Sequence, residues 1–112
     1  MMIIRRKIQD RRLDKIKKQL LELGMNPSTD GMLFWTIAID FARKDKNLVV
    51  KMTEMYRKVA KHCRTDLGKV ERNMRTSLGP IKEKVQEKYK YNGKIDKKTF
   101  LSLCNYLDCE AK

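Results

Sequence analysis

Residues 56–78, YRKVAKHCRTDLGKVERNMRTSL, contain two helical periods separated by a tight break. Apolar residues recur at helical spacing in each half, at Tyr56, Val59, Ala60 and Cys63 and then at Leu67, Val70, Met74 and Leu78. Between the halves, Thr65 is the predicted N-cap of the second helix because its hydroxyl can accept a free backbone N–H. Asp66 suits the positive end of that helix. The pattern therefore predicts two short helices that pack through their apolar faces.

The second helix of this pair, from Thr65 to Leu78, has a polar and basic outer face. The side chains predicted to point outward are Lys69, Arg72, Asn73, Arg75 and Thr76. A basic helix held out by a shorter helix is a helix-turn-helix arrangement, whose second helix fits the major groove of DNA. Any basic helical hairpin would show a similar pattern, and Arg64 stands where the motif often has Gly. The segment by itself leaves both interpretations open.

The charge of the whole chain favours a polyanionic partner. The 112 residues include 27 Lys and Arg against 14 Asp and Glu, which gives a net charge of +13. Such an excess destabilises a compact chain by self-repulsion unless a polyanion is near. Nucleic acid is the first candidate and an anionic membrane surface the second. With one Trp, four Tyr and three Phe, the chain has few side chains for a base-stacking platform.

Residues 3–23 form one amphipathic helical pattern with a strongly basic face that includes Arg11 and Arg12. Three interpretations are open: a solvated helix that packs on the domain, an arm that grips phosphates, and a membrane-surface helix. The third is the weakest, because no aromatic residue anchors the apolar face. We divide the chain into a basic N-terminal extension, residues 1–18, and a helix-turn-helix domain, residues 19–112.

The remaining segments also read as helices, over residues 32–43, 48–54, 81–90 and 97–107. Gly24 is a predicted C-cap of the first helix, and Asp30 and Asp96 are predicted to cap later helices. Gly79-Pro80 is expected to break the basic helix, and Asn92-Gly93 to form a turn. No stretch shows sustained period-2 alternation. The predicted fold is all-α, a compact bundle of about six helices with a helix-turn-helix and a basic N-terminal helix.

Residue patterns for catalysis or metal binding are missing from the sequence. His62 is the only histidine, and it and Cys63 point about 100° apart on a helix. The three cysteines, Cys63, Cys104 and Cys109, lack zinc-site spacing and fit a reducing compartment. No apolar run approaches the roughly 20 residues that span a bilayer. We expect a soluble cytoplasmic, nucleoid-associated protein that is not an enzyme and needs no cofactor or metal.

Two strings within residues 56–78 resemble sequences of a known family. Y-x-x-V-A-K starts at Tyr56, and T-x-x-x-K-V-E-R-x-x-R starts at Thr65. They are similar to Y-P-x-I-A-K and T-x-S-R-V-E-R-x-I-R in the C-terminal DNA-binding domain of the master sporulation response regulator of endospore-forming bacteria. Further patches at residues 23–33 and 93–107 follow in the same order, so the likeness covers roughly residues 20–107.

The resemblance implies an all-helical domain whose recognition helix is Thr65–Leu78. It implies a base contact for Arg72 and base or phosphate contacts for Lys69, Glu71 and Arg75. Glu71 could accept from cytosine N4 or hold a neighbouring Arg. The outward stripe adds Asn73 and Thr76 to the predicted base contacts. The predicted DNA backbone contacts are Lys58, Lys61, Arg64, Thr65, Arg11 and Arg12.

The chain also departs from that family. Gly68 and Lys69 replace its Ser and Arg, and Lys is a point charge where Arg is a planar fork. The family's phosphoacceptor receiver domain has no counterpart in these residues, so we expect a stand-alone member with another form of control.

We therefore expect a sequence-specific transcription regulator that binds double-stranded DNA, with a homodimer on DNA as one option. A receiver-less partner or competitor of a full-length regulator, and a structured-RNA or non-specific nucleic-acid-binding protein, are the alternatives.

Overall fold

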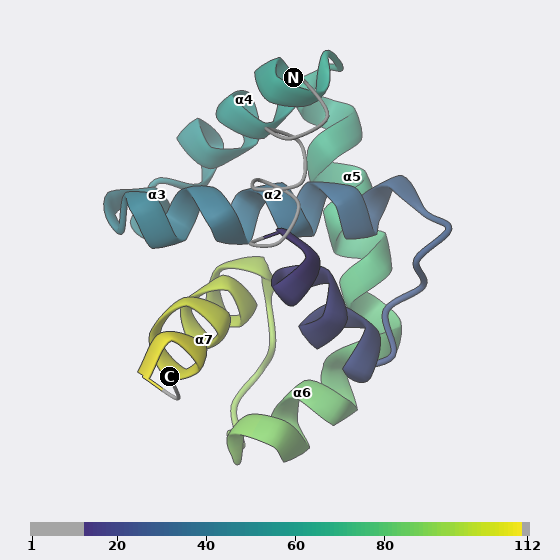
Figure 1. Cartoon of the computed structure of the whole chain (residues 1–112), viewed down its shortest axis with the longest axis vertical. Coiled ribbons are helices and arrows are strands. Elements are labelled where there is room, and N and C mark those ends of the chain that lie inside the picture. The colour runs from purple at the N-terminus through teal and green to yellow at the C-terminus, as the bar shows by residue number, and fades with distance from the viewer. Residues whose placement is uncertain (1–12, 111–112) are drawn as a thin grey trace, which may run out of the picture.

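The computed structural model describes residues 13–110, with side chains described up to residue 105. Every regular element in this part of the chain is helical, which confirms the all-α prediction. A first helix covers residues 13–22. It is followed by α2 (Asp30–Lys44), α3 (Asn47–Val50), α4 (Met52–Cys63), α5 (Leu67–Leu78), the 3-10 turn η1 (Gly79–Ile81), α6 (Lys82–Tyr89) and α7 (Lys97–Glu110) (Figure 1).

Gly24 closes the C-terminus of the first helix, as the sequence predicts. Gly24 has φ +93°, a left-handed conformation that side chains other than glycine's rarely allow. The backbone N–H of Met25 donates to the carbonyl of Leu20 at 3.0 Å, a bond that closes a helix C-terminus. The helix also carries Ile16 and Leu20 into the core, where both are fully buried. Residues 3–12 of the predicted helix lie outside the described part of the chain.

Two predicted boundaries between residue 30 and residue 54 are wrong. Asp30 is the first residue of α2 and not its cap; Thr29 is the N-cap residue, and its side chain makes no capping bond. The helix predicted over residues 48–54 is divided, because α3 ends at Val50 and α4 begins at Met52. Met52, Met55, Tyr56 and Val59 continue one apolar stripe at helical spacing, so residues 52–54 belong to the following helix.

Most of the predicted features after α5 are confirmed, but Asn92-Gly93 forms only a bend at Gly93 and not a hydrogen-bonded turn. Gly79-Pro80 ends α5 at Leu78, and the chain passes through η1 before it resumes as α6. Asp96 caps α7, since its carboxylate accepts the backbone N–H of Thr99 at 2.8 Å. This bond is the main reason why the pKa of Asp96 is lowered. The final helix is longer than predicted, running to residue 110 and not 107.

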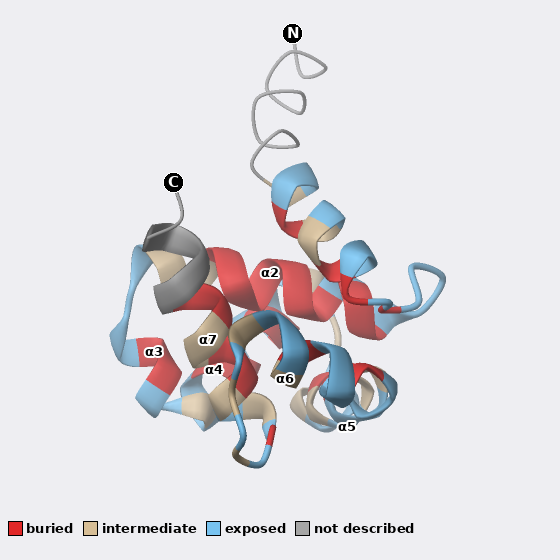
Figure 2. Cartoon of the chain, turned by 90° about the horizontal axis from the view of Figure 1, so that it is seen from below, coloured by how far each residue is buried: buried red, intermediate tan, exposed pale blue. Residues whose placement is uncertain are grey.

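Helix α2 is the centre of the fold, and ten of its fifteen residues are buried. Figure 2 shows it as the most continuously buried element of the molecule. Trp35 is fully buried, and its ring meets the ring of Phe100 from α7 edge to face, with centroids 4.8 Å apart. The indole Nε1–H donates to the carbonyl of Met74 in α5 at 2.9 Å. One side chain therefore joins α2 to both α5 and α7.

The start of α2 approaches α5 closely at Gly31. A β-carbon at Gly31 would lie 2.6 Å from the backbone carbonyl oxygen of Asn73 and in steric conflict with Oγ of Ser77. Only glycine leaves room for this approach, so residue 31 sets the distance between the two helices. None of the described helices is long and apolar enough to cross a membrane.

Gly31→Ala is expected to destabilise the protein by about 1–3 kcal/mol, the usual cost of an added methyl group in a closely packed contact. Urea unfolding of both proteins measures the difference. Gly68→Ala is the matched control, because its β-carbon would meet only the end of the exposed Asp66 side chain, at 3.3 Å. Equal unfolding free energies for Gly31→Ala and wild type would contradict the close contact.

Candidate nucleic-acid interface

Helices α4 and α5 form the predicted pair of helices around a three-residue turn. Arg64 ends α4 in a left-handed conformation, φ 56° and ψ 50°. The N–H of Thr65 donates to the carbonyl of Ala60 at 2.9 Å, which closes the turn. A non-glycine residue in this conformation carries some backbone strain. The turn nevertheless forms with arginine and leaves the side chain of Arg64 exposed.

The N-cap of α5 is Asp66 and not Thr65, which corrects the sequence prediction. Asp66 has an extended backbone, φ −95° and ψ 158°, and its carboxylate accepts the N–H of Lys69 at 2.7 Å. Thr65 lies one residue too early, because its backbone belongs to the closing turn of α4. A carboxylate at this position satisfies a free N–H and also interacts favourably with the helix dipole.

The outer face of α5 is polar and open to solvent. Val70, Met74 and Leu78 are buried on the inner face. Lys69, Arg72 and Thr76 are exposed and follow one another at helical spacing on the opposite side. Asn73 is half-buried beside this stripe, and its amide donates to the carbonyl of Lys69 at 2.8 Å. Four of the six predicted base-contacting residues therefore share one side of the helix.

One edge of this face meets the start of α2. The ammonium group of Lys69 lies 3.5 Å from the carboxylate of Asp30, and both side chains are about half exposed. An ion pair of this kind contributes little to stability. It does hold the charge of Lys69 towards α2.

The other edge carries an ion-pair network centred on Glu71. Its carboxylate accepts from Arg75 at 2.8 Å and from Lys97, at the start of α7, at 2.9 Å. The hydrogen bond from Lys97 is the main cause that lowers the pKa of Glu71. Burial and then the carboxylates of Glu71 and Asp96 raise the pKa of Tyr56 to about 12, so this phenol stays protonated. Of the two roles open to Glu71, the structure shows it holding a neighbouring arginine.

The predicted backbone-contacting residues gather around the turn between α4 and α5, as far as they are described. Lys58 and Lys61 are exposed on α4, Arg64 is exposed in the turn, and Thr65 is half-buried. Arg11 and Arg12 lie outside the described residues. Sequence reasoning missed the ion-pair partners of the outer face, because Asp30 stands 39 positions from Lys69 and Lys97 stands 26 positions from Glu71.

The cysteine and histidine residues of the described chain do not form a reactive pair. Cys63 is a free thiol, and the sulfur of the buried Cys104 accepts from the hydroxyl of Tyr89 at 3.9 Å. Burial is the main cause that raises the pKa of Cys63, which keeps its thiol protonated. His62 is exposed, and its ring lies edge-on to Phe41 with centroids 5.6 Å apart. Cys109 lies outside the residues whose side chains are described.

Comparison with known proteins agrees with the family likeness found in the sequence. A family model described as sporulation initiation factor Spo0A C terminal matches residues 16–101. No curated protein and no solved structure gave a match. The matched range includes the first helix from Ile16 and all of the elements from α2 to α6.

Asp66→Ala is expected to lower the unfolding free energy by about 1 kcal/mol, because the N–H of Lys69 loses its capping acceptor. Thr65→Ala is the matched control and should cost less, since the Thr65 hydroxyl does not cap α5. Urea denaturation of the three proteins measures both differences. A larger loss for Thr65→Ala would restore the N-cap predicted from the sequence.

The Glu71 network is expected to make stability depend on pH in the acid range. Because the folded pKa of Glu71 lies below its ordinary value of 4.5, the network stabilises the fold above that pH and is lost as the pH falls through the folded pKa. The gap in unfolding free energy between wild type and Glu71→Gln should therefore shrink between about pH 5 and pH 3.

Thermal unfolding at a series of pH values measures this gap. Glu54→Gln is the control, because that carboxylate lies 3.8 Å from Arg57 on an exposed surface. A gap for Glu71→Gln that stays constant down to pH 3 would show that the network does not stabilise the folded state.

Proposed function

Because the chain belongs to the sporulation initiation factor Spo0A C-terminal family, whose members are DNA-binding regulator domains and not enzymes, we propose that it reads DNA sequence with α5 in the major groove. In this proposal it is a transcription regulator of the sporulation type, acting on the nucleoid in the cytoplasm. Its partner is double-stranded DNA.

The exposed stripe of α5 is the observation that carries the proposal. Lys69, Arg72 and Thr76 stand clear of the core on a helix whose inner face is fixed by three buried apolar residues and by the Trp35 bond. A major groove admits one helix with its side chains, and it presents a distinct pattern of donors and acceptors for each base pair. A rigid helix with an exposed polar stripe meets both requirements.

Arg72 is the principal base-reading residue in this proposal. It is exposed at the middle of α5, where an arginine can donate two parallel hydrogen bonds to O6 and N7 of guanine. Thr76 follows one turn later and can contact either a base edge or a thymine methyl group. Asn73 lies at the edge of the stripe, with its amide nitrogen engaged by the backbone.

The remaining residues of α5 have roles limited by their ion pairs. Arg75 is held by both carboxylate oxygens of Glu71, at 3.1 and 2.8 Å, which fixes its guanidinium at the edge of the groove-facing surface. Glu71 acts through Arg75 and Lys97 and not on a base. Lys69 shares its charge with Asp30, so its reach to DNA competes with that pair. These two pairs distinguish the proposed readout from that of a helix with three free cations.

Phosphate contacts position the helix in the groove. Lys58, Lys61 and Arg64 are exposed on α4 and in the turn that precedes α5, close to the helix N-terminus. Thr65, Arg11 and Arg12 complete the proposed backbone contacts. Such contacts fix register and orientation without carrying sequence information.

Arg72→Ala is expected to weaken binding to the preferred sequence by about 1–3 kcal/mol and to leave most of the affinity for scrambled DNA. The cause is the loss of base contacts while the phosphate contacts remain. Fluorescence anisotropy with the best-bound duplex from a random pool and its scrambled counterpart measures both affinities.

Lys46→Ala is the matched control for Arg72→Ala. It removes the same charge from an exposed position at α3, which lies at the opposite end of α2 from α5 (Figure 1). The control should keep the preference of the wild type. Equal losses on preferred and scrambled DNA for Arg72→Ala would contradict the assignment of α5 as the reading helix.

A further inference from the structure

The two segments that border the exposed face of α5 differ in charge. On one side, residues 24–31, GMNPSTDG, contain one Asp and neither Lys nor Arg. On the other side, residues 90–98, KYNGKIDKK, contain four Lys and one Asp. Figure 2 shows α5 nearly end-on between these two segments, with the first to the right and the second at the bottom of the view. A polyanion lying across α5 would meet unlike charges at its two borders.

The lysine-bearing border is attached firmly to the domain. Ile95 is 2% exposed and fixes the segment in the core. Asp96 caps α7, and Lys97 reaches Glu71 of α5 at 2.9 Å. The Lys97–Glu71 pair places the start of α7 against α5. Lys94 and Lys98 are exposed on either side of this anchored stretch.

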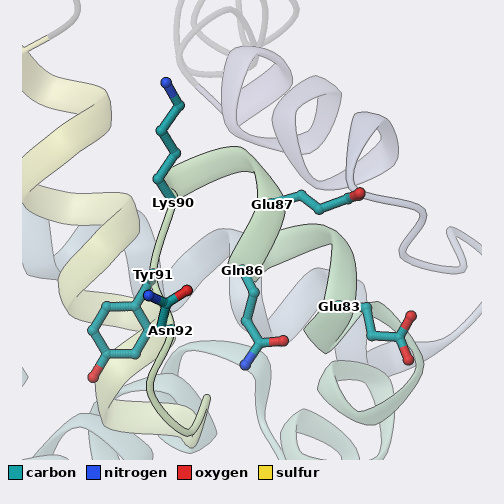
Figure 3. Close-up of a pocket in the computed structure, with 6 residues that line it drawn as sticks. All are labelled: Glu83, Gln86, Glu87, Lys90, Tyr91 and Asn92. Atoms are coloured by element: carbon teal, nitrogen blue, oxygen red, sulfur yellow. The ribbon is translucent and has the colours of Figure 1, made fainter.

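The beginning of the same segment has a different environment. Lys90, Tyr91 and Asn92 line an open pocket of about 610 Å³ together with side chains of α6, which are Glu83, Gln86 and Glu87 (Figure 3). Figure 3 shows the two carboxylates pointing outward from α6. Carboxylates at this end would repel a phosphate chain. The part of this border that can attract a phosphate chain is therefore limited to residues 94–98.

We propose that Lys94, Lys97 and Lys98 form a second phosphate-binding surface, which contacts the backbone of the DNA strand that borders the groove occupied by α5. This inference rests on the proposed function. Together with Arg75, these lysines place four cations against the two carboxylates of Glu71 and Asp96, so the border keeps a positive excess. The lysine ammonium groups make the contact, and the capped N-terminus of α7 does not, because Asp96 occupies it.

The unequal charges of the two borders favour one placement of DNA on α5. DNA on α5 would be drawn towards α7 and away from residues 24–31, where Asp30 is about half exposed beside Lys69. Contacts from the turn after α4 and from the start of α7 would then hold the backbone at two separate places. Two such places fix the angle of α5 in the groove, which one cluster of lysines cannot do.

The test compares Lys94→Ala/Lys98→Ala with Lys46→Ala/Lys51→Ala, a double variant that removes the same charge at the two ends of α3. Lys97 is left intact because it also anchors α7 to α5. Affinity for the preferred and the scrambled duplex is measured at several salt concentrations. The first variant should lower both affinities alike and reduce the salt exponent by about 0.9 for each lost phosphate contact. The control should keep the wild-type exponent.

A neutral methylphosphonate placed at one phosphate at a time locates the contact. Wild type should lose affinity at a small set of phosphates on one border of the groove. In Lys94→Ala/Lys98→Ala, a methylphosphonate within that set should cause no further loss of affinity. A methylphosphonate at any other contacted phosphate should lower its affinity as much as it lowers that of the wild type. An unchanged profile of losses in this variant, or a salt exponent equal to that of the control variant, would overturn the proposal.

The two proposals fail in different ways. If Arg72→Ala loses its sequence preference while Lys94→Ala/Lys98→Ala behaves like its control, α5 reads the groove and the second surface is wrong. If the wild type shows no preference among duplexes, the proposed reading by α5 is wrong, and the surface that rests on it falls as well.

Discussion

The contact between α2 and α5 is the constraint on which the rest of the structure depends. Gly31 lets the two helices approach until its hydrogen atoms face the backbone of Asn73, and Trp35 donates to the carbonyl of Met74 one turn further along. These two contacts hold the inner face of α5 against α2, in which ten of fifteen residues are buried. The outer face of α5 is then free of any packing role, so its side chains can serve recognition.

Elements with a strong local signal could be predicted from the sequence, and elements set by tertiary contacts could not. Gly24, Gly79-Pro80 and Asp96 act through their own backbone neighbours, and the structure confirms all three. The chain divides near Lys51, where the apolar stripe of α4 begins, and Asp66 caps α5 because the closing turn of α4 takes up Thr65. The pairing of Glu71 with Lys97 was not predictable, because only the folded chain brings α7 to α5.

The charge of the chain is organised and not spread evenly. Ion pairs with Asp30 and Glu71 hold Lys69 and Arg75 at the two edges of α5, and Arg72 stands between them. Beyond these edges, one border carries an aspartate and the other carries lysines. Base reading at the centre with phosphate contacts at unequal borders would give both sequence preference and a defined orientation on the duplex.

Selection of duplexes from a random-sequence pool by the wild-type protein is the measurement that tests the central claim most directly. The claim is that the exposed face of α5 reads a base sequence. It predicts strong enrichment of one short sequence motif at moderate salt, where non-specific binding is weakened. Retention of DNA without enrichment of any motif would show that the protein binds the backbone alone, and would contradict the account.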